Sequence, residues 1–298
     1  MDIAVTGSTG LIGTRLVRTL EGDGHRVLRL VRPDSSGTHG DTATWDPARG
    51  TIDDAALEGV DAVVHLAGVG IADSRWTDAQ KGRILRSRSA GTTLLADALA
   101  RLQSPPAVLL SGSAIGYYGD HGDLPIDETT GPGDDFPARV CVQWESCAAP
   151  AVDAGLRVAF LRTGIVQSTD GGALAKQLPF FKLGLGGKVG SGKQWVSWIS
   201  IDDEIRAIQF LLDHDVAGPV NLVAPEPVTN AEYTTTLGGV LHRPTTILPI
   251  TGPRLLYGRE LADSLLLTSQ RVVPEVLTEA GFEFAHPELR GALEHLLG

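Results

Sequence analysis

The chain has 298 residues, of which 42% are hydrophobic and 20% are charged, so it is long and apolar enough to bury a sizeable core. Its formal net charge of −11 repels polyanions, which excludes nucleic acid as a principal partner. The N-terminus lacks a signal-peptide pattern, and no apolar run reaches the roughly 18 residues of a membrane span, so we expect a cytoplasmic protein.

The first part of the chain alternates short β-rich runs with longer helical patterns. Such alternation predicts a doubly wound parallel sheet of the Rossmann type, in an α/β fold. We expect this first domain to cover residues 1–165. Its predicted strands are 2–6, 26–31, 61–66, 107–111 and 157–161, and its predicted helices are 11–21, 77–102 and 136–154.

After Gly164 the pattern changes, and we expect a smaller mixed α/β lobe over residues 166–298, partly interleaved with the first domain. The glycine-rich segment 171–192 predicts a mobile loop with one short helix. Within it and just beyond, residues 182–193 are expected to form a lid that offers Lys188 and Lys193 to an anionic ligand, or simply to solvent. Predicted strands are 198–201 and 219–223, and predicted helices are 202–213, 230–241, 253–267 and 287–297.

Residues 7–13 form a G-x-x-G-x-x-G loop between the first strand and the first helix. Three glycines in this position permit a tight turn, the close approach of a diphosphate and close packing of helix on sheet. The free N–H groups and the positive end of the helix dipole then receive the diphosphate. The candidate cofactor contacts in this loop are Gly7, Thr9, Gly10, Leu11, Ile12 and Gly13.

The end of the second strand indicates which dinucleotide binds. An NAD-binding chain usually has Asp or Glu about 20 residues after the loop. This chain has Arg32 there, and a guanidinium suits the 2′-phosphate of NADP; the alternative role is that of a solvated arginine at a strand end. The first domain is therefore predicted to bind NADP, which leaves the second lobe to bind a small-molecule substrate.

Several separate stretches, in the same order along nearly the whole chain, resemble extended short-chain dehydrogenases/reductases. The closest resemblance is to their atypical subfamily of sugar-nucleotide-epimerase-like proteins, within the NAD(P)-dependent epimerase/dehydratase superfamily. The stretches are 7–13, His65-Leu66-Ala67-Gly68, 111–119 (SGSAIGYYG), Trp76, Ser87-Arg88, Trp144-Glu145, 183–187 (LGLGG), 198–203 (WISIDD) and 269–274 (SQRVVP).

The resemblance implies further contacts with NADP, and it places Val166 near the nicotinamide. It also implies a nucleotide sugar as substrate, by the family's name, and a homodimer that pairs through the helices 77–102 and 136–154. The implied cofactor contacts are Val31, Arg32, Leu66, Ala67, Gly68, Arg88 and Val166.

The catalytic residues of the resembled family are only partly present. Ser113 matches the serine that orients the substrate oxygen, but Cys141 and Glu145 occupy the positions of the usual tyrosine and lysine. Tyr117 and Tyr118 follow Ser113 and are the alternative catalytic candidates; aromatic packing is the other role open to them. Cys141 is expected to be a small buried side chain, and Glu145 to anchor a helix or bind a partner group.

Other polar residues have simpler expected roles. His65 ends a buried strand, where we expect it to form local hydrogen bonds. Asp202 and Asp203 are expected to lie at the N-cap and first turn of a helix, and no metal site is predicted. Trp195 and Trp198 either stack on a ligand or pack in the core.

Two functions therefore remain open from the sequence. The first is an NADP-dependent oxidoreductase or epimerase that acts on a small polar substrate through a rearranged catalytic site. The second is a catalytically silent NADP(H)-binding protein that senses the redox ratio or serves as a scaffold. The intact glycine loop supports both, and the missing tyrosine and lysine keep the second open.

Overall fold

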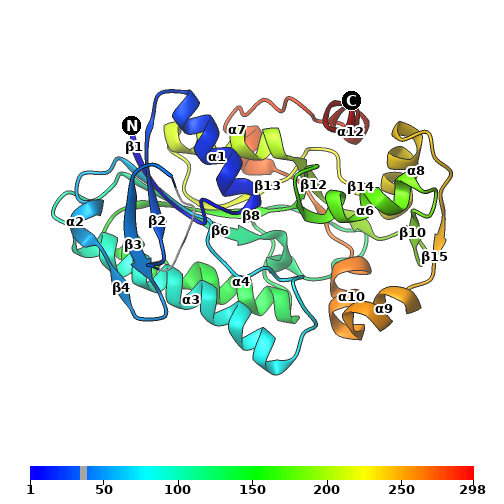
Figure 1. The fold of residues 1–298 in the computed structure, drawn as a ribbon, viewed down its shortest axis with the longest axis horizontal. Coiled ribbons are helices and arrows are strands. Elements are labelled where there is room, and N and C mark those ends of the chain that lie inside the picture. The colour runs from blue at the N-terminus through cyan, green and yellow to red at the C-terminus, as the bar shows by residue number, and fades with distance from the viewer. Residues whose placement is uncertain (34–38) are drawn as a thin grey trace.

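An eight-stranded sheet crosses the computed structural model, which describes residues 1–33 and 39–298 (Figure 1). The strand order is β13-β8-β6-β5-β1-β2-β3-β4, and only the β3–β4 pair is antiparallel. This largely parallel sheet confirms the predicted Rossmann-like α/β fold. Its strands are β1 (Asp2–Thr6), β2 (Arg26–Val31), β3 (Thr42–Asp46), β4 (Thr51–Ile52), β5 (Ala62–His65), β6 (Val108–Ala114), β8 (Arg157–Thr163) and β13 (Gly218–Leu222).

Helices cover both faces of the sheet, as Figure 1 shows for α1 and α7 on one side and α3 and α4 on the other. The first helices of the chain are α1 (Leu11–Gly22), α2 (Asp54–Leu57), α3 (Asp78–Arg101), the 3-10 helix η1 (Ile115–Tyr118), α4 (Phe136–Ser146), α5 (Ala149–Asp153) and α6 (Gly172–Lys182). They are followed by α7 (Ile201–Asp213), α8 (Asn230–Val240), α9 (Thr251–Tyr257), α10 (Arg259–Leu266), α11 (Glu275–Glu279) and α12 (Leu289–Leu297).

Alternation along β1 supplies two separate cores. Ile3 and Val5 pack in a cluster that includes side chains of α1 and α7, whereas Ala4 packs in a second cluster with side chains of α3. Both sets are fully buried, as is usual for strands covered on both faces. The apolar run at positions 3–5 of β1 therefore fits this central place in the sheet.

Four short strand pairs lie outside the main sheet. They are β7 (Pro125–Ile126) with β16 (Arg271–Val272), β9 (Ile165–Gln167) with β12 (Trp198–Ser200), β10 (Gly187–Val189) with β15 (Thr246–Leu248), and β11 (Trp195–Val196) with β14 (Val228–Thr229). The predicted loop 171–192 thus contains α6 and a paired strand.

Two predicted helices were wrong in extent. The segment 136–154 divides into α4 and α5, because Pro150 in the first turn of α5 has no N–H to continue the hydrogen-bond ladder. The segment 253–267 divides at Gly258, which has a positive φ of 85°. Strand β3 was not predicted.

The later part of the chain contributes to the main sheet and also builds its own core. Strand β13 pairs with β8, and α7 packs on the same sheet. A third apolar cluster, which includes Trp198, Tyr233 and Leu293, gathers around α6, α8 and α12. The division at residue 165 stays a prediction. Across the described ranges, no helix combines the length and apolarity that crossing a membrane requires.

Candidate functional site

The glycine loop forms a tight cradle at the end of β1. Gly7 has a positive φ of 68°, and its carbonyl oxygen accepts a hydrogen bond from Gly10 N at 2.9 Å. A Cβ atom on Gly13 would lie only 2.1 Å from that same oxygen. Helix α1 begins at Leu11, and its N-cap, Gly10, has no side chain to cap the first N–H groups. The loop therefore fits a diphosphate at the helix start.

Residues 66–68 lie directly against this cradle. A Cβ atom on Gly7 would be 2.8 Å from the carbonyl carbon of Leu66. Thr6 Oγ1 accepts hydrogen bonds from the N–H groups of Leu66 and Ala67, at 3.1 and 3.2 Å. The structure thus brings Leu66 and Ala67 beside the glycine loop.

Arg88 borders the same region from helix α3. Its guanidinium carbon lies 3.2 Å from where a Cβ on Gly68 would stand, and Nη1 donates to the Val69 carbonyl at 2.8 Å. It also lies over the Trp144 ring, 4.7 Å from the centroid. Burial lowers the pKa of Arg88. Gly68 and Arg88 therefore lie together beside the cradle.

Two of the remaining cofactor candidates lie at the end of β2, and a third packs on the apolar cluster beneath α1. Val31 and Arg32 follow Leu30, which pairs with Thr6 at the end of β1, so both strands end beside the loop. Arg32 is exposed and Val31 is half-buried. Val166 packs on the same core cluster as Leu11, on the α1 side of the sheet.

A buried network replaces the usual tyrosine and lysine. Ser113 Oγ donates to Glu145 Oε1 at 2.7 Å. Arg162 Nε and Nη2 donate to Glu145 Oε1 and Oε2, both at 2.9 Å. Burial lowers the pKa of Arg162, but the hydrogen bonds and charge of Glu145 raise it overall. The network thus presents a serine hydroxyl whose proton points at a fixed carboxylate.

The two tyrosines have different surroundings. Tyr118 is fully buried; its hydroxyl donates to Asn221 Oδ1 at 2.7 Å and accepts from Arg162 Nη1 at 3.0 Å. Burial raises the pKa of Tyr118 to about 12, which disfavours it as a general base. Tyr117 is half-buried, and the Arg162 guanidinium lies 3.5 Å from its ring centroid. Tyr117 is therefore the better placed candidate.

Cys141 and His65 have the local roles that the sequence predicts. Cys141 is buried, and burial, aided by the charge of Glu145, raises the pKa of its thiol to about 12. His65 is fully buried between Thr6 Oγ1 at 2.7 Å and Thr92 Oγ1 at 3.0 Å. Burial lowers the pKa of His65 to about 4. Neither side chain has the exposure that a catalytic acid or base needs.

The acidic pair at the start of α7 also tethers the C-terminal segment. Ser200 Oγ caps the helix, so the expected N-cap at Asp202 was wrong, and both acids lie in the first turn. Asp203 accepts hydrogen bonds from the N–H groups of Ala285 and His286, at 2.8 and 2.9 Å. Asp202, His286 and His295 place ligand-type atoms within 4.8 Å of one another, a grouping that the sequence did not predict. Arg15 already forms an ion pair with Asp202 at 2.9 Å.

The tryptophans and lysines of the substrate side differ in burial and in their contacts. Trp198 is fully buried in the third core cluster, and Trp195 stacks with Arg271, 4.5 Å from its ring centroid. Lys188 is half-buried in β10, whereas Lys193 is exposed.

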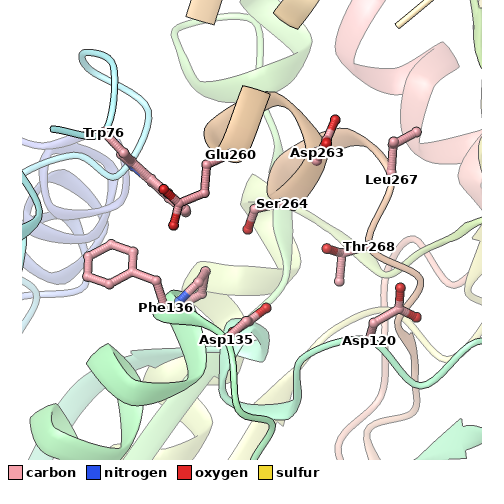
Figure 2. Close-up of a pocket in the computed structure, with 10 residues that line it drawn as sticks. Trp76, Asp120, Asp135, Phe136, Glu260, Asp263, Ser264, Leu267 and Thr268 are labelled. Carbon is pink, nitrogen blue, oxygen red and sulfur yellow. The ribbon is translucent and has the colours of Figure 1, made fainter. Parts of the chain in front are cut away.

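Sequence reasoning missed two features of the site. One is Arg162; its signal is a charge near the end of an otherwise apolar strand run. The other is a pocket of about 290 Å³ between Trp76, the start of α4 and helix α10 (Figure 2).

Comparisons with known proteins match the chain over nearly its whole length. The profile of the NAD dependent epimerase/dehydratase family matches residues 3–223, and a domain of unknown function, DUF1731, matches residues 248–296. An epimerase family protein of Mycobacterium bovis is 44% identical over 293 residues, which cover 98% of this chain and 96% of that protein.

Two solved structures share the fold at similar identity. The crystal structure of the human epimerase family protein SDR39U1 (isoform 2) with NADPH is 34% identical, with a TM-score of 0.90 and 99% of each chain covered. The nucleoside-diphosphate sugar epimerase from Corynebacterium glutamicum is 38% identical, with a TM-score of 0.80; the match covers all of this chain and 58% of that one.

Proposed function

Since this chain belongs to the NAD dependent epimerase/dehydratase family, we propose that it binds NADPH and transfers hydride between this cofactor and a small polar substrate. The observation that carries the proposal is the cradle around Gly13, where any side chain would collide with Gly7 O. The human relative was crystallised with NADPH, which supports the choice of cofactor. We place the activity in the cytoplasm.

The residues that would hold NADPH surround this cradle. The N–H groups at the start of α1 would receive the diphosphate, and Arg32 would bind the 2′-phosphate. NADPH supplies a hydride to a carbonyl carbon when it is bound. The remaining contacts of the proposed site are Thr9, Gly10, Leu11, Ile12, Val31, Leu66, Ala67, Gly68, Arg88 and Val166.

The proposed proton path runs through Ser113. In alcohol oxidation, the substrate hydroxyl donates its proton to Ser113 Oγ while the Ser113 proton passes to Glu145 Oε1, 2.7 Å away. Carbonyl reduction uses the same steps in reverse. Arg162 keeps the Glu145 carboxylate oriented, and Tyr117 would contact the substrate from the neighbouring η1 helix.

One observation favours a second function, that of a silent NADP(H) sensor or scaffold. Both oxygens of Glu145 already accept hydrogen bonds from Arg162, so this carboxylate is engaged in a buried ion pair. A sensor would keep the cofactor cradle and would need no proton transfer at this position.

Transfer of deuterium separates the two functions. Purified protein loaded with 4-deuterated NADPH would be incubated with a pool of carbonyl compounds that includes nucleotide sugars, a class suggested by the name of the Corynebacterium glutamicum protein. We expect deuterium in a product, and a loss of about 10²–10⁴-fold in the transfer rate in Ser113→Ala. Tight NADPH binding with no deuterated product would instead support the sensor.

A further inference from the structure

The pocket beside η1 adjoins the proposed catalytic site. Asp120 lies two residues beyond η1 and lines the pocket together with Pro137. A Cβ atom on Gly116, within η1, would lie 3.2 Å from Pro137 Cβ. The wall of the pocket is therefore continuous with the helix that follows Ser113 and carries Tyr117.

One side of the pocket is aromatic. Trp76 and Phe136 meet edge to face, with ring centroids 4.8 Å apart. The Trp76 indole is oriented by a hydrogen bond from Nε1 to the Ile71 carbonyl at 2.9 Å. Figure 2 shows both side chains at the same end of the pocket. Such a pair offers an apolar surface to the C–H face of a saturated ring.

The other sides present oxygen atoms. Figure 2 shows Asp120 and Asp135 across the pocket from Glu260 and Asp263 of α10, with the Ser264 and Thr268 hydroxyls between them. Asp135 caps α4 by accepting from Ala138 N at 2.8 Å, and burial raises the pKa of Asp135. Carboxylates and hydroxyls together accept and donate hydrogen bonds to a ligand rich in hydroxyl groups.

The negative charge around the pocket disfavours the binding of a phosphorylated ligand. Glu260 is paired with Lys81, and Asp263 with Arg254 at 2.6 Å, so those cations already have partners. Asp120 and Asp135 add negative charge at the opposite wall. A diphosphate in this pocket would face the like charges of Asp120 and Asp135, and this repulsion disfavours its binding.

We propose that this pocket binds the uncharged polyhydroxylated ring of a sugar or cyclitol, and not a nucleoside diphosphate. The inference rests on the proposed function, because it makes this ring the substrate of the Ser113 site. Trp76 and Phe136 hold the face of the ring, and the acidic wall binds its hydroxyls.

The test uses methyl β-D-glucopyranoside, myo-inositol, UDP-glucose and UDP as probes of the NADP⁺-loaded protein. Saturation-transfer NMR and calorimetry would follow binding. We expect at least one uncharged probe to bind, with UDP-glucose no tighter than the glucoside and UDP alone not binding. We expect the affinity for that uncharged probe to fall in Trp76→Ala, by about tenfold, and also in Ser264→Ala. The surface variant Val152→Ala is the control and should keep the wild-type affinity.

The outcome is separable from the cofactor step, because NADPH binding is measured by fluorescence on the same protein preparations before NADP⁺ is added. Loss of NADPH binding would overturn the proposed function. If NADPH binds normally, either of two results overturns the pocket assignment alone. One is UDP-glucose or UDP binding tenfold or more tightly than the uncharged probes; the other is no probe responding to Trp76→Ala and Ser264→Ala.

Discussion

Arg162 donates two hydrogen bonds to the carboxylate of Glu145, and the two side chains are only 4% and 11% exposed. Breaking a buried pair from one side leaves an uncompensated charge, which typically costs about 3–5 kcal/mol. We therefore expect Arg162→Met to lower the free energy of unfolding by this amount. Urea denaturation would measure it.

The double variant Glu145→Gln/Arg162→Met serves as the control, because it removes both charges. Its loss should be clearly smaller than that of Arg162→Met alone. Equal losses in the single and double variants would contradict the idea that the unpaired carboxylate causes the instability.

The geometry of the glycine loop predicts that alanine weakens NADPH binding at one glycine of α1 and leaves it unchanged at another. Gly13→Ala places a Cβ 2.1 Å from Gly7 O, so the loop must shift and NADPH binding should weaken by more than about tenfold. Gly22→Ala, at the other end of α1, adds a Cβ with no atom of the described residues within 4 Å, so this variant should bind NADPH normally. Fluorescence titration with NADPH compares the two; equal affinities would argue against a diphosphate at this turn.

Arg32 should distinguish the two nicotinamide cofactors. Its guanidinium is exposed at the end of β2, beside the loop. Arg32→Ala is expected to weaken NADPH binding by about 1.5–3 kcal/mol, as for hydrogen bonds to charged groups, and to leave NADH almost unchanged. Equal losses for both cofactors in a calorimetric titration would remove Arg32 from the 2′-phosphate site.

The burial of Glu204 predicts that the free energy of unfolding depends on pH. It is fully buried, and Thr163 Oγ1 donates to its Oε1 at 2.9 Å, whereas Oε2 has no hydrogen-bond partner among the residues that the structure describes. Burial raises the pKa of Glu204 from 4.5 to about 8, so the folded state holds a proton that the unfolded state releases above pH 4.5. The contribution of Glu204 to the free energy of unfolding is therefore largest below pH 4.5. It falls as the pH rises to about 8, by on the order of 4 kcal/mol.

The isosteric variant Glu204→Gln should lack this decline. Its unfolding free energy, measured in urea from pH 4.5 to 8, should fall less steeply than that of the wild type. His65 acts in the opposite direction over an overlapping range, since its pKa is lowered to about 4, but it is the same in both proteins. Parallel pH curves would show that the Glu204 carboxyl is not held protonated.

The part of the fold set by local pattern was predictable from the sequence. Strand β1 and the glycine loop are adjacent in the chain, and each is marked by a strong local signal. Strand β3 (Thr-Ala-Thr-Trp-Asp) lies near the edge of the sheet, where it pairs with β2. Its alternation of polar and apolar residues is a strand signal, but the run is short and has only two apolar residues, so it was not predicted. The division of 136–154 was readable from Pro150, but the helical pattern on either side outweighed it.

The sequence predicted site residues only where they act through the backbone or occupy a position that aligns with a motif of the resembled family. Ser113 and Glu145 were identified at their positions, whereas their partner Arg162 comes from a different strand, β8. No spacing in the sequence links Arg162 to a carboxylate on α4. The pocket likewise joins Trp76 to Glu260, residues that only the folded chain brings together.

The pairing of β13 with β8 bears on how the protein can be shortened. A fragment ending near residue 165 would lack β13 and so leave one edge of β8 without its partner strand. It would also expose to solvent the apolar surface that α7 covers. Unprotected strand edges promote self-association. The dinucleotide-binding half should therefore be recovered as aggregate unless residues 201–223 are retained with it.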